Sequence, residues 1–362
     1  MTSKQRFIAA LERRTPDRLP VTTHHLMAYF LNKYMNGMGE QEFFDHFGLD
    51  PITYPQCFVL DATPDWKIVS ENVSPSGEPT VRHTVRTPKG VMTATIQSNE
   101  ITGWLTEHLV KEKRDIDRIA YAPVPRMDVE MVNRAADEYG ERGLVRGTVQ
   151  SFEIFGQPGC WQDAACLYGI EKLIMAAMED PQWVHEFLGM LLRRKLASLG
   201  SCAGSKYDLI ELGGGDASST VISPQIFDEF VAPYDSQIIA LAHELGLRVV
   251  YHTCGGMMPF LERIADMGPD AMETLTPVGM GGDADLAEAK RRVGDRVCLI
   301  GGFDQFHFLR DCTPTDTRAE VRRCFEAAGE GGGFILSMSD HFFDADPELI
   351  RAYADEARAC TY

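Results

Sequence analysis

The chain has 362 residues, of which 44% are hydrophobic, 9% aromatic and 24% charged, a composition typical of a folded globular protein and not of a disordered one. Its 35 Lys+Arg and 53 Asp+Glu residues give a formal net charge of −18, which argues against a nucleic-acid-binding protein. No apolar run approaches the roughly 18 residues that a membrane span needs. Nine cysteines without regular spacing indicate reduced thiols, so we expect a cytoplasmic protein.

Short β-branched runs that end in polar or glycine-rich loops predict a parallel sheet. In chain order they span residues 19–23, 144–150, 207–212, 247–252, 271–275, 297–301 and 334–337, and an eighth strand is expected near residues 57–60. Amphipathic helices are expected at residues 170–178, 181–198, 224–245, 258–267, 285–293, 315–329 and 347–359. Eight β/α units predict an α/β fold of the (β/α)8 TIM-barrel class. A doubly wound sheet is the alternative, but no G-x-G-x-x-G motif follows a predicted strand.

Residues 66–110 interrupt the alternation of strands and helices. Alternating runs at 67–70, 80–86 and 91–97 are separated by the turn-forming segments SPSGEP (74–79) and TPKG (87–90). This pattern predicts an antiparallel β-hairpin insertion that lies across one end of the barrel. No linker separates it from its surroundings, so we expect residues 1–362 to form a single domain.

Ligand-type side chains follow the predicted strand ends, where a TIM barrel builds its active site. His252 and Cys254 are two residues apart and therefore lie on the same side of an extended chain. An imidazole and a thiolate are a ligand mixture that Zn²⁺ favours. The alternative is a buried cysteine that packs as a small hydrophobic residue.

The other strand ends supply further candidates. Glu273 and Asp340 are predicted to complete the metal site, with capping of a helix or an ion pair as the alternative for each carboxylate. Other polar residues are predicted to be catalytic or to contact the substrate. The catalytic candidates are Asp304, Asp340 and His341, and the substrate-contacting candidates are His24, His25, Gln150, Glu211, Asp216 and Gln305.

Several segments carry a resemblance to a known family. ALERRTPDRLPV (residues 10–21), ISPQIFDEFVAPY, GLRVVYHTCGG, CLIGGFDQ and FILSMSD resemble the uroporphyrinogen decarboxylase superfamily, and the similarity covers nearly the whole chain. The resemblance implies a TIM barrel with one of two activities. One is cofactor-free decarboxylation of a tetrapyrrole, and the other is zinc-dependent transfer of a methyl group to or from a corrinoid protein.

The two branches of this superfamily differ in their motifs. The decarboxylases have an arginine-containing segment after the first strand, where this chain reads VTTHHLMAY (residues 21–29) without arginine. The methyltransferases have a His-x-Cys pair, which His252 and Cys254 match, and a later cysteine that falls at or next to Asp340 here. The resemblance therefore favours a zinc-dependent methyltransferase, with a metal-free decarboxylase as the alternative.

The substitution at the third ligand position bears on the substrate. An oxygen ligand in place of sulfur makes zinc a harder Lewis acid, which suits a methoxyl compound, a methylamine-type compound or tetrahydrofolate better than a thiol. The corrinoid (cobalamin) is expected on a separate partner protein, because the chain lacks a D-x-H-x-x-G motif. The sequence leaves open the identity of the methyl donor and acceptor, the direction of transfer, and whether the protein forms a homodimer.

Overall fold

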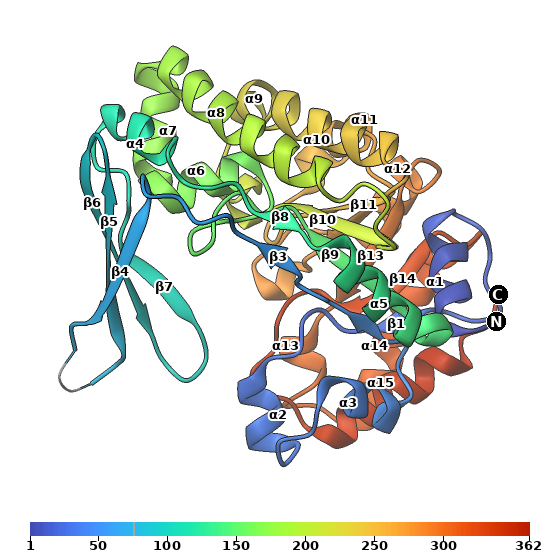
Figure 1. Cartoon of the computed structure of the whole chain (residues 1–362). Coiled ribbons are helices and arrows are strands. Elements are labelled where there is room, and N and C mark those ends of the chain that lie inside the picture. The colour runs from blue at the N-terminus through green and yellow to red at the C-terminus, as the bar shows by residue number, and fades with distance from the viewer. Residues whose placement is uncertain (75–76) are drawn as a thin grey trace.

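Eight parallel strands form the centre of the structure, a computed structural model that describes residues 1–74 and 77–362 (Figure 1). They lie in the order β1-β14-β13-β12-β11-β10-β9-β2. The sheet is nearly closed into a barrel, because the backbone N–H of Asp50, two residues before β2, donates to the carbonyl of Val21 in β1 at 2.7 Å. The predicted (β/α)8 class with an antiparallel insertion is confirmed. The strand bounds are β1 Val21–Thr22, β2 Ile52–Thr53, β9 Leu144–Thr148, β10 Leu209–Gly213, β11 Val249–His252, β12 Ala271–Thr274, β13 Cys298–Phe303 and β14 Phe334–Met338.

The expected strand near residues 57–60 is not part of the barrel. The second barrel strand is β2, which pairs with Leu144 and Val145 of β9. Phe58–Val59 (β3) instead pairs antiparallel with Arg126–Met127 (β8). Both strands have only two residues, and Asp50 anchors the chain just before β2 by its hydrogen bonds with Val21.

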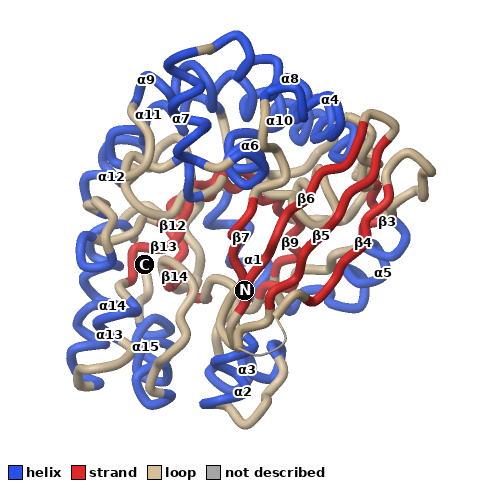
Figure 2. Tube along the Cα trace, turned by 90° about the vertical axis from the view of Figure 1, so that its left-hand side faces the viewer, coloured by secondary structure: helices blue, strands red, loops and turns tan. Residues whose placement is uncertain are grey.

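Helices pack around the barrel (Figures 1 and 2). The expected helices are all present, with the one at 224–245 divided into α9, a π-helical turn at Phe227–Val231 and α10. Within the described residues, no helix combines the length and apolarity needed to cross a lipid bilayer. The helix bounds are α1 Ser3–Leu11, α2 Ala28–Tyr34, α3 Glu40–Phe47, α4 Ile116–Ile119, α5 Val129–Tyr139, α6 Cys160–Tyr168, α7 Ile170–Glu179, α8 Pro181–Gly200, α9 Pro224–Ile226, α10 Ala232–Glu244, α11 Leu261–Met267, α12 Leu286–Val293, α13 Gln305–Phe308, α14 Pro314–Ala328 and α15 Pro347–Ala359.

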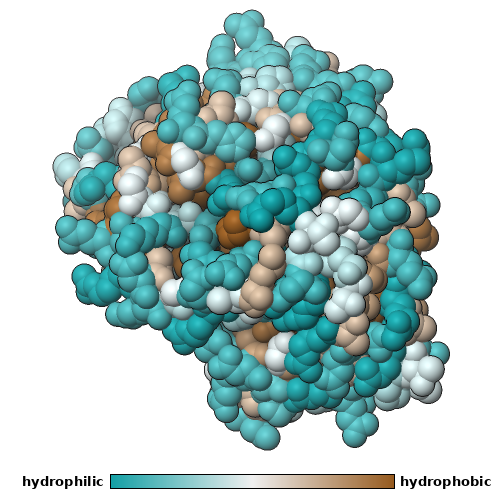
Figure 3. Space-filling view, turned by 90° about the vertical axis from the view of Figure 1, so that its right-hand side faces the viewer, coloured by the Kyte–Doolittle hydropathy of each residue, from teal (hydrophilic) through white to brown (hydrophobic). Residues whose placement is uncertain are grey.

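Helix α1 covers the N-terminal end of the barrel. Its buried residues Phe7, Ala10 and Leu11 pack with apolar residues from the barrel strands, among them Leu209 and Val250. The face that carries both chain termini is mostly hydrophilic, with apolar side chains visible between polar ones (Figure 3). The carboxyl ends of the strands are therefore the end at which a substrate can approach, as in other TIM barrels.

The insertion is a four-stranded antiparallel sheet, not a hairpin. It comprises β4 Lys67–Asn72, β5 Thr80–Thr87, β6 Gly90–Ser98 and β7 Gly103–Glu107, and the sequence pattern indicates only the first three. Part of the predicted turn at 74–79 lies outside the described residues, which omit 75–76. Val85, Met92 and Ala94 on one face of the sheet are buried in the main hydrophobic core. Figures 1 and 2 show the sheet beside the barrel, next to α4.

A buried carboxylate holds the seam of the barrel together. Asp50 is fully buried and accepts hydrogen bonds from Arg6 at 2.7 Å, from Arg18 at 2.8 and 2.9 Å and from Ser3 Oγ at 2.7 Å. It also accepts the backbone N–H of Val21 at 3.0 Å. One side chain thereby joins α1, the approach to β1 and the approach to β2.

The substitution Asp50→Ala should lower the free energy of unfolding by about 3–5 kcal/mol, because it removes the fully buried carboxylate that pairs with both Arg6 and Arg18. Asp61→Ala is the matched control, since Asp61 pairs with Arg126 at 2.8 Å but both side chains are exposed. Asp61→Ala should change the free energy of unfolding much less than Asp50→Ala does, because water screens an exposed ion pair. Urea unfolding of the two variants measures both values, and equal losses would contradict the role given to Asp50.

A second carboxylate links two strands of the insertion. Glu107 of β7 accepts hydrogen bonds from Thr93 and Thr95 of β6 at 2.6 and 2.7 Å and pairs with Lys111 at 3.1 Å. Burial acts to raise the pKa of Glu107, but these hydrogen bonds outweigh it and lower the pKa from 4.5 to about 2. The carboxylate therefore stabilises the folded state above its unfolded pKa, and this contribution disappears as the pH falls from about 4.5 towards 2.

Glu107→Gln should remove this pH-dependent contribution. The difference in free energy of unfolding between wild type and variant should be largest above about pH 5 and should shrink as the pH falls towards 2. Denaturant unfolding followed by tryptophan fluorescence, which includes the signal of Trp104 in β7, measures the difference at each pH. A difference that does not change with pH would contradict the prediction.

Candidate active site

Polar side chains from five strands meet at the open end of the barrel. His24 follows β1, Arg146 lies in β9, Glu211 in β10, His252 ends β11 and Glu273 lies in β12. The strand register sets His252 directly beside Glu273. Because the strands are parallel and the barrel is nearly closed, residues far apart in the sequence share one rim.

A buried ion network lies at the centre of this rim. Arg146 is only 2% exposed and donates to both carboxylate oxygens of Glu273, at 2.9 and 2.5 Å, and to Glu211 at 2.9 Å. Burial acts to lower the pKa of Arg146, but the two carboxylates raise it well above its usual value. Burial likewise favours the neutral form of Glu273, yet Arg146 and His252 hold its pKa well below the usual range. The network therefore contains an arginine cation and a glutamate anion at neutral pH.

The imidazole of His252 lies between its partner Glu273 and the neighbouring Cys254 in the site. Its Nδ1 lies 2.9 Å from Oε1 of Glu273. Burial lowers the pKa of His252, but hydrogen bonds to the Cys254 thiol and to Glu273 raise it well above its usual value. The thiol has room because residue 215 is glycine, where a Cβ atom would lie 2.7 Å from Cys254 Sγ. A carboxylate on one ring nitrogen is the usual way in which proteins orient a metal-binding histidine.

Four histidines cluster around this point. The ring of His24 lies 5.1 Å from that of His252, 4.6 Å from that of His25 and 4.9 Å from that of His341. Burial and the neighbouring charges of His25 and His252 lower the pKa of His24 well below its usual value. A neutral imidazole can donate its lone pair to a metal ion. In two overlapping sets of residues, the possible ligand atoms lie within 4.8 Å of one another. The first set is His24, His252 and Glu273, and the second is His24, Asp340 and His341.

Asp340 and His341 form a pair of their own. One oxygen of Asp340 accepts the backbone N–H of His341 at 2.7 Å and lies 2.8 Å from its Nδ1. Burial raises the pKa of Asp340, but these bonds outweigh it and lower the pKa to about 2. The fully buried Gln305 supports the same turn, because its amide donates to the carbonyl of Asp340 at 2.8 Å and accepts the N–H of Ser339 at 3.0 Å.

The structure gives three of the predicted residues partners elsewhere. Asp304 caps α13 and lies 2.8 Å from Nδ1 of His307. Asp216 exchanges two hydrogen bonds of 2.8 Å with the side chain of Gln162. Gln305, as described, bonds backbone atoms. The geometry brings together His24, His25, Glu211, His252, Cys254, Glu273, Asp340 and His341.

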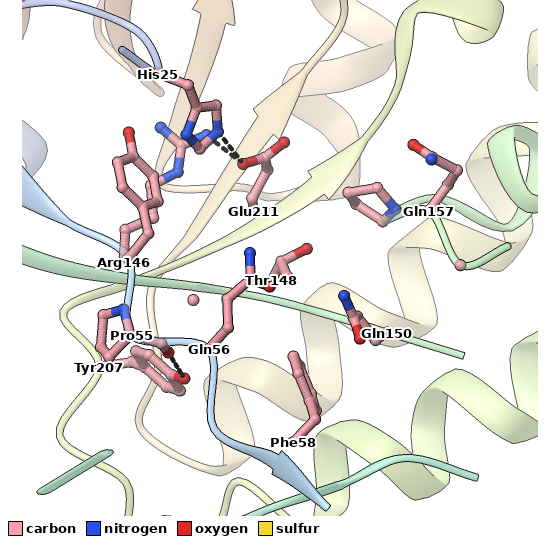
Figure 4. A pocket seen from close by; sticks show the side chains of 14 residues that line it. His25, Pro55, Gln56, Phe58, Arg146, Thr148, Gln150, Gln157, Tyr207 and Glu211 are labelled. Atoms are coloured by element: carbon pink, nitrogen blue, oxygen red, sulfur yellow. Dashed lines mark hydrogen bonds and ion pairs between the residues drawn. The ribbon is translucent and has the colours of Figure 1, made fainter. Parts of the chain in front are cut away.

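A cavity of about 190 Å³ opens beside the histidines (Figure 4). Its lining includes three of the predicted residues, His25, Gln150 and Glu211. The lining consists of His25, Tyr54, Pro55, Gln56, Phe58, Arg146, Gly147, Thr148, Gln150, Gly156, Gln157, Pro158, Tyr207 and Glu211.

Arg146 and Tyr54 are site residues that the sequence reasoning missed. The ring of Tyr54 lies 4.2 Å from that of His25, and the guanidinium of Arg146 lies 5.7 Å from the Tyr54 ring centre. A signal for Arg146 exists in the sequence, because it interrupts the apolar run Leu144–Thr148. A charged side chain in a buried strand needs carboxylate partners at the same level of the barrel. Tyr54 carries no such signal.

Comparison with known proteins decides the family. A profile described as uroporphyrinogen decarboxylase (URO-D) matches residues 105–360. The chain belongs to the uroporphyrinogen decarboxylase family. The chain is 27% identical over 263 residues to a uroporphyrinogen decarboxylase of Psychromonas ingrahamii, and the match spans 67% of each protein. It is 35% identical over 146 residues to a uroporphyrinogen decarboxylase of Neisseria meningitidis serogroup C, spanning 39% of this chain and 38% of that protein.

A solved structure also matches this member of the uroporphyrinogen decarboxylase family. It is described as a methyltransferase from Methanosarcina mazei and superposes with a TM-score of 0.67, covering 99% of this chain and 98% of its own. The sequence identity is 15%, so the match establishes a shared fold.

The buried network predicts unequal effects for the same substitution at two positions. Glu273→Gln should lower the free energy of unfolding by about 3–5 kcal/mol, because it leaves the buried Arg146 without its bidentate carboxylate. Glu211→Gln should cost less, since Glu211 makes one bond to Arg146 and its side chain is more exposed. Urea unfolding measures both, and an equal or larger loss for Glu211→Gln would contradict this account of the network.

Proposed function

We propose that this protein is a zinc-dependent methyltransferase that moves a methyl group between a small methylated substrate and a corrinoid carried by a partner protein. The observation that carries the proposal is His252, with its Nδ1 on Glu273 and with Cys254 at the same ring. The shared fold with a structure described as a methyltransferase supports it.

The donor atoms at the barrel mouth fit a zinc ion. His252 and Cys254 would hold the ion, and His24 is close enough to His252 to supply a third ligand. Glu273 would orient His252 and not bind the ion, because its oxygens already accept bonds from Arg146 and His252. Mixed nitrogen and sulfur donors with one position left for substrate are typical of catalytic zinc sites.

Each residue of the site would have its own role in methyl transfer. A bound zinc would supply Lewis acidity at the heteroatom that carries the methyl group. His341 is placed to hold and deliver a proton to the group that leaves, and Asp340 orients its ring through Nδ1. Arg146 and Glu273 keep His252 in one orientation. The corrinoid would be the methyl acceptor or donor and would reach the barrel mouth on its own protein.

A metal-free decarboxylase is the second candidate, favoured by the names of the sequence relatives. Two observations weigh against it. The segment after β1, residues 21–29, contains no arginine to bind substrate carboxylates. Arg146, the arginine in the lining of the cavity, is already neutralised by Glu211 and Glu273.

The substitution Cys254→Ser tests the proposed function, because a hydroxyl is a poor zinc ligand at neutral pH. We expect loss of zinc and of methyl transfer, with a thermal midpoint that moves by only a few degrees. Cys312→Ser is the matched control, since Cys312 is also half-buried but bonds Thr317 and lies outside the site. It should keep stoichiometric zinc and activity.

Elemental analysis and a methyl-transfer assay give the two readouts. If Cys254→Ser retained full zinc and activity, the His252 and Cys254 pair would be incidental to the site. If the wild-type protein released carbon dioxide from a tetrapyrrole in the presence of chelator, the decarboxylase would replace the methyltransferase.

A further inference from the structure

We propose that the cavity beside the histidines binds an uncharged, single-ring aromatic compound that carries ether or hydroxyl oxygens. The inference rests on the proposed function, in which such a compound would be the methyl donor or the demethylated product. The sequence leaves three substrate classes open, which are methoxyl compounds, methylamine-type compounds and tetrahydrofolate. The cavity favours aromatic methoxyl compounds among them.

The size of the cavity sets the first limit. A protein cavity of about 150 Å³ is large enough to bind benzene. The cavity here is about 190 Å³, which suits one substituted ring. A tetrapyrrole has four linked rings, and a folate joins a bicyclic pterin to an aminobenzoyl group and glutamate. Either would extend far beyond this space.

The walls of the cavity combine flat apolar surface with uncharged polar groups. Phe58 and Tyr207 contribute rings (Figure 4). The half-buried side chains of Thr148, Gln150 and Gln157 also line it, and among the described residues none of the three side chains makes a hydrogen bond to protein. Such groups are available to a ligand that offers its own donors and acceptors. Phenol and ether oxygens meet that requirement, whereas an unsubstituted alkyl compound does not.

The charged side chains at the cavity are paired with one another, so they disfavour ionic ligands. The carboxylates of Glu273 and Glu211 accept three hydrogen bonds from Arg146 and offset its charge, so Arg146 attracts the carboxylate of an acidic ring only weakly. A methylammonium ion would need an open aromatic face. The guanidinium of Arg146 already lies 5.7 Å from the centre of the Tyr54 ring, and His25 contacts the same ring at 4.2 Å.

One wall is fixed by a buried ion pair behind it. Lys195 and Asp163 are fully buried and lie 2.8 Å apart. Asp163 accepts the backbone N–H of Gln157 at 2.6 Å, and Lys195 donates to the Gln157 carbonyl. These bonds hold the loop that carries Gln157 and Pro158 in one conformation. A wall held in this way is preorganised for a ligand of defined shape.

The cavity leads to the histidine cluster. His25 forms part of its lining, and the ring of His25 lies 4.6 Å from that of His24 and 5.7 Å from that of His341. A ring bound in the cavity can therefore present one substituent to the predicted metal ligands. This position is where a methoxyl oxygen has to lie if the proposed methyl transfer takes place.

Calorimetric titration of the full-length protein tests the proposal with four probes, which are guaiacol, its carboxylated counterpart vanillate, tetramethylammonium and tetrahydrofolate. Each titration is run on zinc-loaded and on chelator-treated protein without corrinoid. We expect saturable binding of guaiacol in both forms and binding of the other three that is at least about tenfold weaker, since the cavity offers no charge partner or has too little space.

Two variants test the site. Gln150→Leu keeps the size of the side chain but removes its hydrogen-bonding groups, and it should weaken guaiacol binding about 3–10-fold. Thr148→Val serves the same purpose if Gln150→Leu does not fold. Gln182→Leu is the control, since Gln182 is exposed on α8 and bonds only Glu186 among the described residues. It should leave guaiacol binding unchanged.

The outcomes separate this inference from the proposed function. Equal or tighter binding of vanillate, tetramethylammonium or tetrahydrofolate would overturn the inference, as would guaiacol binding that neither Gln150→Leu nor Thr148→Val weakens. Specific guaiacol binding by a protein that shows no methyl transfer with zinc and corrinoid would support the cavity assignment and contradict the proposed function. Methyl transfer from a methylamine by a protein that does not bind guaiacol would support the proposed function and contradict the cavity assignment.

Discussion

The burial of one guanidinium group, that of Arg146, is the constraint on which the site depends. An unpaired charge at 2% exposure would cost several kcal/mol, and Glu273 and Glu211 offset this cost. Because Arg146 fixes both oxygens of Glu273, the same carboxylate can hold Nδ1 of His252 in one place. The pairing also withdraws the arginine charge from the cavity. One interaction thus orients the proposed metal ligand and makes the neighbouring cavity suitable for an uncharged substrate.

Much of the fold follows from local patterns in the sequence. Seven barrel strands are predictable because long apolar runs mark strands such as β13 and β14, which are buried along their length. Strand β2 is not predictable in the same way, since Ile52–Thr53 has two residues and its place depends on the contacts of Asp50 with Arg6 and Val21. Strand β7 is hard to predict from the sequence for a related reason. It is short and pairs with β6 across an irregularity in register at Thr95 and Ile96.

The site shows a similar division between local and long-range information. Residues at strand ends can be picked out as candidates, and most of them meet at one rim. Local structure gives Asp304 and Gln305 other partners, because Asp304 caps the helix that follows it and Gln305 holds the turn at Asp340. A list of strand ends also cannot find Arg146, which lies within a strand. Its role appears only in the barrel, where β9, β10 and β12 bring Arg146, Glu211 and Glu273 together.

X-ray absorption spectroscopy of the zinc-loaded protein tests the central claim most directly, because it reports the number and kind of atoms that bind the metal. The account predicts one sulfur ligand at about 2.3 Å, from Cys254, with nitrogen and oxygen ligands at about 2.0–2.2 Å. Glu273 should remain outside the coordination sphere, so Glu273→Gln should leave the sulfur and nitrogen count unchanged. A spectrum with no sulfur ligand, or a protein that takes up no zinc, would contradict the account.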